Sequence, residues 1–116
     1  MAYSVERAVE TDRDLEAIFD FLVRSYIDFG DSHTEALSRA AKRLEAIEKA
    51  AEKLGTTPHQ GTLREDLAPG IRCVTKRSAV FYFDVDDERR LVRVLAIFFG
   101  GQDHQRAMLV RLLSKA

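Results

Sequence analysis

Residues 79–99 read AVFYFDVDDERRLVRVLAIFF, two apolar runs separated by a short charged segment. Both runs are rich in the β-branched and aromatic side chains that favour strands. Apolar residues occupy both alternating sets of positions, so the strands Ala79 to Val85 and Arg90 to Phe99 are predicted to lie in the middle of a sheet that is covered on both faces. The turn Asp86-Asp87-Glu88 joins them as an antiparallel pair.

Two further strands are predicted outside this pair. Ile71 to Thr75 precedes it through the turn Lys76-Arg77-Ser78, which makes a three-stranded antiparallel meander. Tyr3 to Val9 is short and partly alternating, and we expect a first strand there, at an edge of the sheet or next to one.

Two amphipathic helices are predicted between the first strand and the meander, one from about Asp12 to Phe29 and one from a cap at Asp31 or Ser32 to about Leu54. Their apolar residues recur at three- and four-residue spacing, and a tight turn makes them an antiparallel hairpin. Asp14 places a negative charge at the positive end of the first helix dipole. The residues expected at the helix ends are Thr11 or Asp12, Gly30, Asp31 or Ser32, and Gly55.

The remaining segments complete an α+β fold. Thr56 to Gly70 is expected to be a loop, with a turn of helix at Leu63 to Leu67. Gln102 to Ala116 is predicted to be a C-terminal helix that is apolar on more than one side, either an interface for a partner or second copy, or a helix that folds back on the sheet. We therefore predict a mostly antiparallel sheet in the order β-α-α-β-β-β, with the helical hairpin on one face and a C-terminal helix.

Composition limits the class of protein. A length of 116 residues predicts one domain, 1–116, and the hydrophobic content of 46% is that of a globular chain. No apolar run is long enough to span a bilayer, and charges at Glu6, Arg7 and Glu10 exclude the apolar core of a secretory signal, so we expect a cytoplasmic protein without membrane contact. The formal net charge of −1 does not favour nucleic-acid binding, which depends on clustered Lys and Arg.

The chain offers few residues for redox or metal chemistry. Cys73 is the one cysteine, and we interpret it as a small buried side chain rather than a catalytic thiol, because the sequence places no base beside it. The histidines at 33, 59 and 104 are too far apart to form a recognisable metal-ligand spacing. We expect neither a metal nor an organic cofactor.

Four elements occur in an order and spacing that carry a family resemblance. The opening DLEAIFDFL, of the type DLxxIxxFL, occupies residues 14–22, Val-Phe-Tyr occupies 80–82, and Gly-Gln-Asp occupies 101–103. Between them lies a segment of the type P-x-x-G-x-x-R-E-x-L-x-x-G-I-R. Its matching residues are Pro58, Gly61, Arg64, Glu65, Leu67, Gly70, Ile71 and Arg72. From about Leu15 to Asp103, the chain resembles the RelE/ParE toxin superfamily of type II toxin–antitoxin systems, whose members are often called plasmid stabilisation proteins.

The resemblance implies a toxin that is neutralised by a cognate antitoxin, with two possible activities. RelE-like members cut mRNA on the ribosome, whereas ParE-like members bind and poison DNA gyrase. The resemblance also implies an antitoxin segment in a groove lined by the helical hairpin and an exposed sheet edge, and either a homodimer or a toxin–antitoxin heterotetramer. A toxin of this kind is expected to be stabilised by complex formation.

The last strand departs from the nuclease members of the superfamily. Where those members carry Arg and His, this chain has Ala96 and Phe99. RNA cleavage needs a base, an acid and a cation for the phosphorane charge. We therefore favour a ParE-like toxin that binds a protein target such as gyrase, and keep open an mRNA endonuclease and a non-toxic relative.

Candidate site residues follow from both alternatives. If the chain is a nuclease, His59, Arg72 and His104 can serve as base, phosphate clamp and acid. If it acts by binding, the candidates for contact with the target or antitoxin are Arg64, Arg72, Arg93 and Asp103. Arg64 and Arg72 also have a structural interpretation, in which they pair with Glu65, Asp66 or Asp103 and fix the loop on the sheet.

Overall fold

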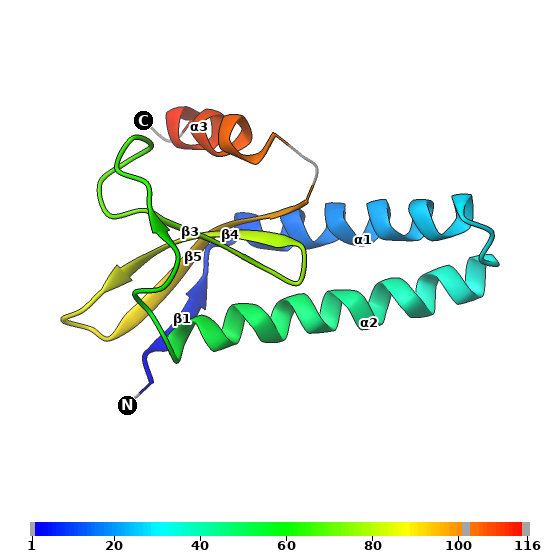
Figure 1. The fold of residues 1–116 in the computed structure, drawn as a ribbon, viewed down its shortest axis with the longest axis horizontal. Coiled ribbons are helices and arrows are strands. Elements are labelled where there is room, and N and C mark those ends of the chain that lie inside the picture. The colour runs from blue at the N-terminus through cyan, green and yellow to red at the C-terminus, as the bar shows by residue number, and fades with distance from the viewer. Residues whose placement is uncertain (1, 101–102, 115–116) are drawn as a thin grey trace.

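The computed structural model describes residues 2–100 and 103–114, and it has two layers of helix around one sheet (Figure 1). A long helical hairpin extends beyond the sheet on one side, and a short helix lies across the sheet near the C-terminus. The order of strand, two helices, strands and final helix is the predicted one. Within the described residues, the elements are β1 (Ser4–Arg7), α1 (Glu10–Asp28), α2 (His33–Glu52), the 3-10 helix η1 (Lys53–Gly55), β2 (Thr62–Leu63), β3 (Arg72–Lys76), β4 (Ala79–Asp86), β5 (Leu91–Phe99) and α3 (His104–Ser114).

The sheet confirms the predicted meander and adds a parallel edge. Its strand order is β1-β5-β4-β3-β2. Strands β2 to β5 pair antiparallel, whereas β1 pairs parallel to β5 with Ser4 opposite Leu91. β1 is thus an edge strand, as expected, and it covers only the first half of β5, because the chain leaves the sheet at Ala8 to enter α1.

Two clusters of apolar side chains lie on opposite faces of β4 and β5. Phe81 and Phe83 pack on the hairpin side, whereas Tyr82 packs on the side of α3. Both central strands are therefore buried on both faces, as their continuous apolar runs predicted. The register between them shifts at Tyr82 and Phe83, so that Tyr82 lies opposite Ala96 and Phe83 opposite Val94. The extra residue, Leu95, is a local bulge.

The helical hairpin is built as its periodicity predicted, with one difference at its start. Ser32 caps α2 in a capping box with Glu35, and Gly30 has the positive φ of +108° that the turn requires. The cap expected for α1 at Thr11 or Asp12 is wrong, because α1 already begins at Glu10 and lacks a side-chain cap. The Thr11 hydroxyl is buried and donates to the carbonyl of Ala8 at 2.7 Å.

The loop between the hairpin and the meander contains an additional strand. The sequence predicted a turn of helix at Leu63 to Leu67, and a turn is present, in which the N–H groups of Leu67 and Ala68 donate to the carbonyl of Arg64. Leu63 itself, however, belongs to β2 and pairs with Arg72. Gly61 precedes β2 with a φ of +80°, and a Cβ on Gly61 would lie 2.5 Å from the carbonyl oxygen of Cys73. The pairing of β2 with β3 therefore depends on glycine at this position, and glycine spacing alone does not distinguish such a strand from a helical turn.

The C-terminal helix folds back on the sheet and also keeps an exposed apolar side. Met108 is fully buried against the sheet, whereas Val110 and Leu113 are 55% and 67% exposed. Gly101, Gln102, Lys115 and Ala116 lie outside the described residues, so the predicted helix start at Gln102 and the Gly-Gln pair of the family pattern are not placed. No helix within residues 2–100 and 103–114 combines the length and hydropathy that a membrane crossing requires.

Candidate functional site

The face of the sheet beneath α3 combines a buried apolar floor with a few polar groups. Tyr82, Ala96 and Met108 are at most 1% exposed, and Phe98 is 6% exposed. The Tyr82 and Phe98 rings meet edge to face, with centroids 6.0 Å apart. Ala96 is therefore buried by its packed neighbours. It stands where the family resemblance expects arginine, so this position has no charge with which to bind a ligand.

Tyr82 and His104 form the central polar contact of this face. The Tyr82 hydroxyl lies 2.7 Å from Nδ1 of His104, the first residue of α3. Burial raises the pKa of Tyr82 to about 12, so its phenol stays protonated at neutral pH. The imidazole tautomer sets the direction of this hydrogen bond: the phenol donates to an unprotonated Nδ1, or a protonated Nδ1 donates to the phenol oxygen. The hydrogen between the Tyr82 oxygen and His104 Nδ1 can therefore belong to either atom. The hydrogen bond also fixes the start of α3 to β4.

A cleft of about 340 Å³ opens beside this pair and is lined by Arg64, Cys73 and His104. Arg64 donates to both carboxylate oxygens of Asp66, at 2.9 and 2.8 Å, which raises the pKa of the guanidinium. Cys73 is half-buried rather than fully buried, and burial raises the pKa of its thiol. The cleft is therefore lined by a neutral thiol, an imidazole and an arginine. The guanidinium of this arginine already donates two hydrogen bonds to Asp66.

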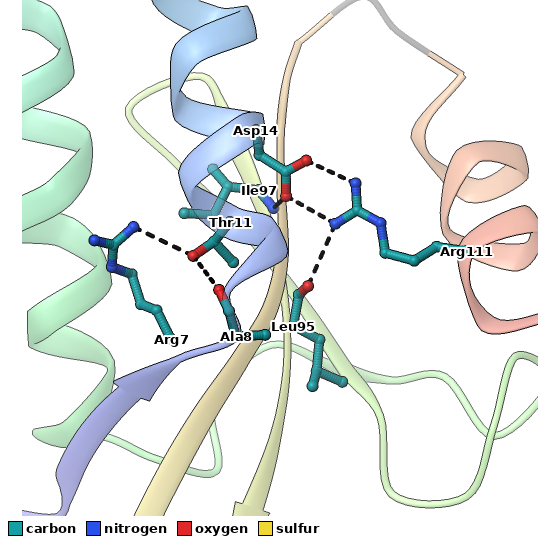
Figure 2. Close-up of polar contacts among 7 residues, drawn as sticks. All are labelled: Arg7, Ala8, Thr11, Asp14, Leu95, Ile97 and Arg111. Carbon is teal, nitrogen blue, oxygen red and sulfur yellow. Dashed lines mark hydrogen bonds and ion pairs between the residues drawn. The ribbon is translucent and has the colours of Figure 1, made fainter. Parts of the chain in front are cut away.

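A buried ion pair closes the opposite side of α3 (Figure 2). Arg111 of α3 donates to both carboxylate oxygens of Asp14 on α1, at 2.6 and 2.8 Å. Asp14 also accepts the backbone N–H of Ile97 at 3.0 Å, and Arg111 donates to the carbonyl of Leu95 at 3.4 Å. The two side chains thus satisfy backbone groups of β5 in the part of its edge that β1 leaves uncovered.

Arg72 points away from the face beneath α3. Its neighbour Cys73 lies opposite Tyr82, in the cluster on the side of α3, whereas Arg72 itself lies opposite Phe83, in the cluster on the side of the hairpin. Because successive side chains of a strand alternate between faces, Arg72 projects on the hairpin side. The nuclease hypothesis required a register that places Arg72 and His104 on one face, and the observed register does not do so.

His59 lies with Arg72 and forms a separate exposed cluster. Arg72 donates from Nη1 to the carbonyl of His59 at 2.9 Å, so Arg72 fixes the loop by a backbone contact rather than by the expected acidic partner. His59 and Tyr3 both contact Oδ1 of Asp87 at 2.8 Å. The Tyr3 hydrogen bond is the main cause that holds the pKa of Asp87 below its usual range. This cluster joins the residue before β1, the loop before β2 and the turn between β4 and β5.

The remaining predicted binding residues lie apart. Arg93 is exposed on β5 and pairs with Asp84 on β4, with Nη2 3.0 Å from Oδ2. Asp103 precedes α3 and accepts the backbone N–H of Arg106 at 3.3 Å. Of the four candidates for binding, Arg64 alone lines the cleft beside His104, and its Asp66 partner is one of the three acids that the sequence proposed.

Sequence reasoning missed the two contacts that hold α3, namely Tyr82 with His104 and Asp14 with Arg111. One signal was present, because Arg111 interrupts the apolar side of a helix that contains Met108 and Leu112. Such a cation needs a partner when the helix is buried. The partner is 97 residues away, however, and Asp14 also fitted a helix-dipole interpretation. No group of three or more His, Cys, Asp or Glu in residues 2–100 and 103–114 is placed to hold a metal ion.

Comparison with known proteins identifies the fold. No protein-family model matches the chain, and no curated protein is significantly similar in sequence. Among solved structures, the chain is similar to a chain of a chromosomal ParDE toxin–antitoxin system from P. aeruginosa, with a TM-score of 0.64, 22% identity, and coverage of 85% of this chain and 97% of that one. The chain has the RelE/ParE toxin fold. This confirms the fold that the sequence resemblance implied.

Two other solved structures of this fold agree. A chain of the toxin–antitoxin complex RelBE2 from Mycobacterium tuberculosis gives a TM-score of 0.61 at 19% identity, covering 88% of this chain and 95% of that one. A mutant of the E. coli toxin RelE in the free state gives 0.58 at 15% identity, covering 96% and 97%. The RelE/ParE fold thus spans nearly the whole chain, and its solved neighbours include both ParE and RelE systems.

Proposed function

We propose that this RelE/ParE-fold chain is the toxin of a type II toxin–antitoxin pair and acts by binding a protein target such as DNA gyrase. The fold supports the first part, because its solved neighbours belong to toxin–antitoxin systems. The sealed face beneath α3 supports the second. Toxins of this kind act in the cytoplasm, and that location is part of the proposal.

The main observation in favour of binding over RNA cleavage is the chemistry of β5. Its residues on the α3 side, Ala96 and Phe98, are buried and apolar, so this strand offers no cation to the phosphorane charge that RNA cleavage develops. The nearest arginine of the cleft, Arg64, already donates to both oxygens of Asp66. Charge stabilisation by this face is therefore weak.

An mRNA endonuclease is the second candidate, supported by the contact between Tyr82 and His104. A histidine at the mouth of a cleft that also contains Arg64 is a possible general acid or base. This set differs from His59, Arg72 and His104, because Arg72 lies on the other face. A non-toxic relative with the same fold is the third alternative.

A cognate antitoxin is the partner that the proposal requires. A groove of about 300 Å³ runs between α1 and the exposed part of the β5 edge, lined by Ala17, Phe21, Ile97 and Phe99 among others. Phe21 is 50% exposed, and its ring centroid lies 5.8 Å from that of Phe99. An amphipathic antitoxin segment can bury this apolar surface against its own, and a two-copies-each assembly is compatible with such a contact.

Induced expression of the chain alone in a bacterial host tests the proposal. Growth, mRNA cleavage at ribosomes, and supercoiling by purified gyrase are measured for the wild type and His104→Ala. The binding mechanism predicts growth arrest with intact mRNA, impaired supercoiling, and retained toxicity of His104→Ala. Ribosome-dependent mRNA cuts that His104→Ala abolishes would establish the nuclease instead, and normal growth with a folded chain would favour the non-toxic relative.

A further inference from the structure

A groove between α2 and the turn that joins β3 to β4 lies away from α3. Its volume is about 770 Å³. Figure 1 shows this turn directed along α2 on the hairpin side of the sheet. The groove lies outside the site discussed above, because it shares no lining residue with the cleft beside His104.

The walls of this groove concentrate positive charge. Five cationic side chains and one carboxylate line the groove, so the lining has a net charge of +4. The whole chain has a formal net charge of −1, so the residues outside the groove together carry −5. Four of the five lysines in the sequence lie here. The charged lining residues are Lys42, Glu45, Lys49, Lys53, Lys76 and Arg77.

Most of these cations are available to a ligand. Lys49 pairs with Glu45 at 3.0 Å, but Lys42, Lys53 and Lys76 make no ion pair with any described residue and are exposed. In contrast, Arg39, Arg64, Arg93 and Arg111 each contact a carboxylate. Several arginines elsewhere in the fold thus pair with acids of the chain itself, whereas three lysines of this groove have no carboxylate partner among the described residues.

The floor of the groove indicates which kind of polyanion fits. Ala46 and Ala50, both half-buried, present aliphatic surface between the cationic walls, Leu54 of the lining is fully buried, and the lining contains no aromatic residue. Proteins that bind single-stranded nucleic acid combine cations with aromatic rings on which bases stack. An aliphatic floor instead matches small apolar side chains of a peptide whose carboxylates face the lysines. Lys42 and Lys53 are eleven residues apart on α2 and η1, a span of about 16 Å, the length of three helical turns.

We propose that this groove binds an acidic, amphipathic peptide segment of a partner protein. Its carboxylates pair with the lysines of α2 on one wall and with Lys76 and Arg77 on the other, while its apolar side lies on Ala46 and Ala50. Charge complementarity steers such a segment to the groove and makes the association sensitive to salt. The inference does not rest on the toxin assignment, because charge and shape of the groove carry it.

Fluorescence anisotropy with the full chain tests this proposal. The probe is a labelled 16-residue helical peptide of Glu, Ala and Leu, compared with the same peptide carrying Lys for each Glu and with 16-nucleotide strands of dT and rU. The acidic peptide is expected to bind, more weakly at 300 mM than at 50 mM salt, and the basic peptide is not. The variant Lys42→Glu/Lys76→Glu, with one change in each wall, is expected to weaken binding about tenfold or more, as loss of several exposed ion pairs predicts.

A matched control reverses two charges elsewhere. Arg13 and Arg24 are exposed on α1 and make no ion pair with the described residues, so Arg13→Glu/Arg24→Glu changes the net charge equally and should leave peptide binding unchanged. Thermal unfolding verifies that each variant folds, and Lys42→Gln/Lys76→Gln replaces the charge reversal if it does not. Three results would overturn the proposal: binding that is absent or insensitive to the groove variants; tighter groove-dependent binding of dT or rU, which would assign a nucleic acid; and a dimer that the groove variants dissociate, which would assign a second copy.

Discussion

Asp14 and Arg111 connect the first helix to the last across the uncovered edge of β5. The two side chains are 97 residues apart in sequence, form two charge-assisted hydrogen bonds, and are 7% and 23% exposed. A pair of this kind is costly to break, because removing one partner leaves the other charge and the N–H of Ile97 without compensation. The position of α3 over the sheet therefore depends on a contact that originates in α1.

Removal of the Asp14 carboxylate should destabilise the protein. We expect Asp14→Ala to lower the free energy of unfolding by about 2–3 kcal/mol, less than for a fully buried pair because Arg111 keeps some solvent contact. Urea unfolding measures this loss. Asp12→Ala is the control, since its carboxylate is 71% exposed and lies 3.5 Å from Arg7, and it should cost less than about 1 kcal/mol. Equal losses in the two variants would contradict the role assigned to Asp14.

The same pair should control the exchange of α3. In Arg111→Ala, the contacts of Met108 and the hydrogen bond between His104 and Tyr82 remain to hold the helix. Amide hydrogens of α3 should then exchange faster than in the wild type, while those of β4 keep their protection, because local opening requires only the detachment of α3. Uniformly faster exchange in both elements would indicate global destabilisation instead.

The raised pKa of Tyr82 predicts a change of stability in alkali. In the folded state its pKa is about 12, above the value of 10.0 for an exposed tyrosine, so the folded state binds this proton more tightly than the unfolded state. The contribution is complete below pH 10 and is lost as the pH rises through 12. Ultraviolet titration should show a phenol ionising near pH 12 that is absent in Tyr82→Phe. The unfolding free energy of that variant should also fall less between pH 10 and 12, and an equal fall would contradict the assignment.

Gly61 should be more sensitive to substitution than Gly70. Both have positive φ, +80° and +78°, but a Cβ on Gly61 would meet the carbonyl oxygen of Cys73 at 2.5 Å, whereas a Cβ on Gly70 would meet nothing within 4 Å. Gly70→Ala is expected to cost about 1 kcal/mol of backbone strain, and Gly61→Ala about 1–3 kcal/mol more. Thermal or urea unfolding of both variants measures the difference. A larger loss in Gly70→Ala would show that β2 does not need this close approach.

The Tyr3 hydroxyl should set the acidity of Asp87. Its hydrogen bond is the largest cause of the lowered Asp87 pKa, followed by the contact with His59. A lowered folded-state pKa means that this stabilisation is present above the ordinary value of 3.8 and is lost as the pH falls through the folded-state value. NMR titration of the Asp87 carboxyl should show its pKa move up toward 3.8 in Tyr3→Phe. A smaller upward shift is expected in His59→Ala, and the reverse order would overturn this ranking.

Elements whose signals are local could be predicted from the amino-acid sequence. The continuous apolar runs of β4 and β5 could be interpreted as central strands because residues on both faces were apolar. The cap candidates Asp31 and Ser32, together with Gly30, predicted the start of α2, since these signals act within a few residues of the chain, and the structure places the cap at Ser32. The resemblance of the central loop to the RelE/ParE pattern then predicted the fold, which the solved neighbours confirm.

The contacts between distant side chains depend on the three-dimensional arrangement of the elements. The faces to which Arg72 and His104 point depend on strand register and on the bulge at Leu95, and a shift of one residue reverses every side chain of a strand. Asp14 contacts Arg111, and Tyr82 contacts His104, because α3 folds back over the sheet. Such contacts join residues that are distant in sequence, and local periodicity carries no information about the partner across that distance.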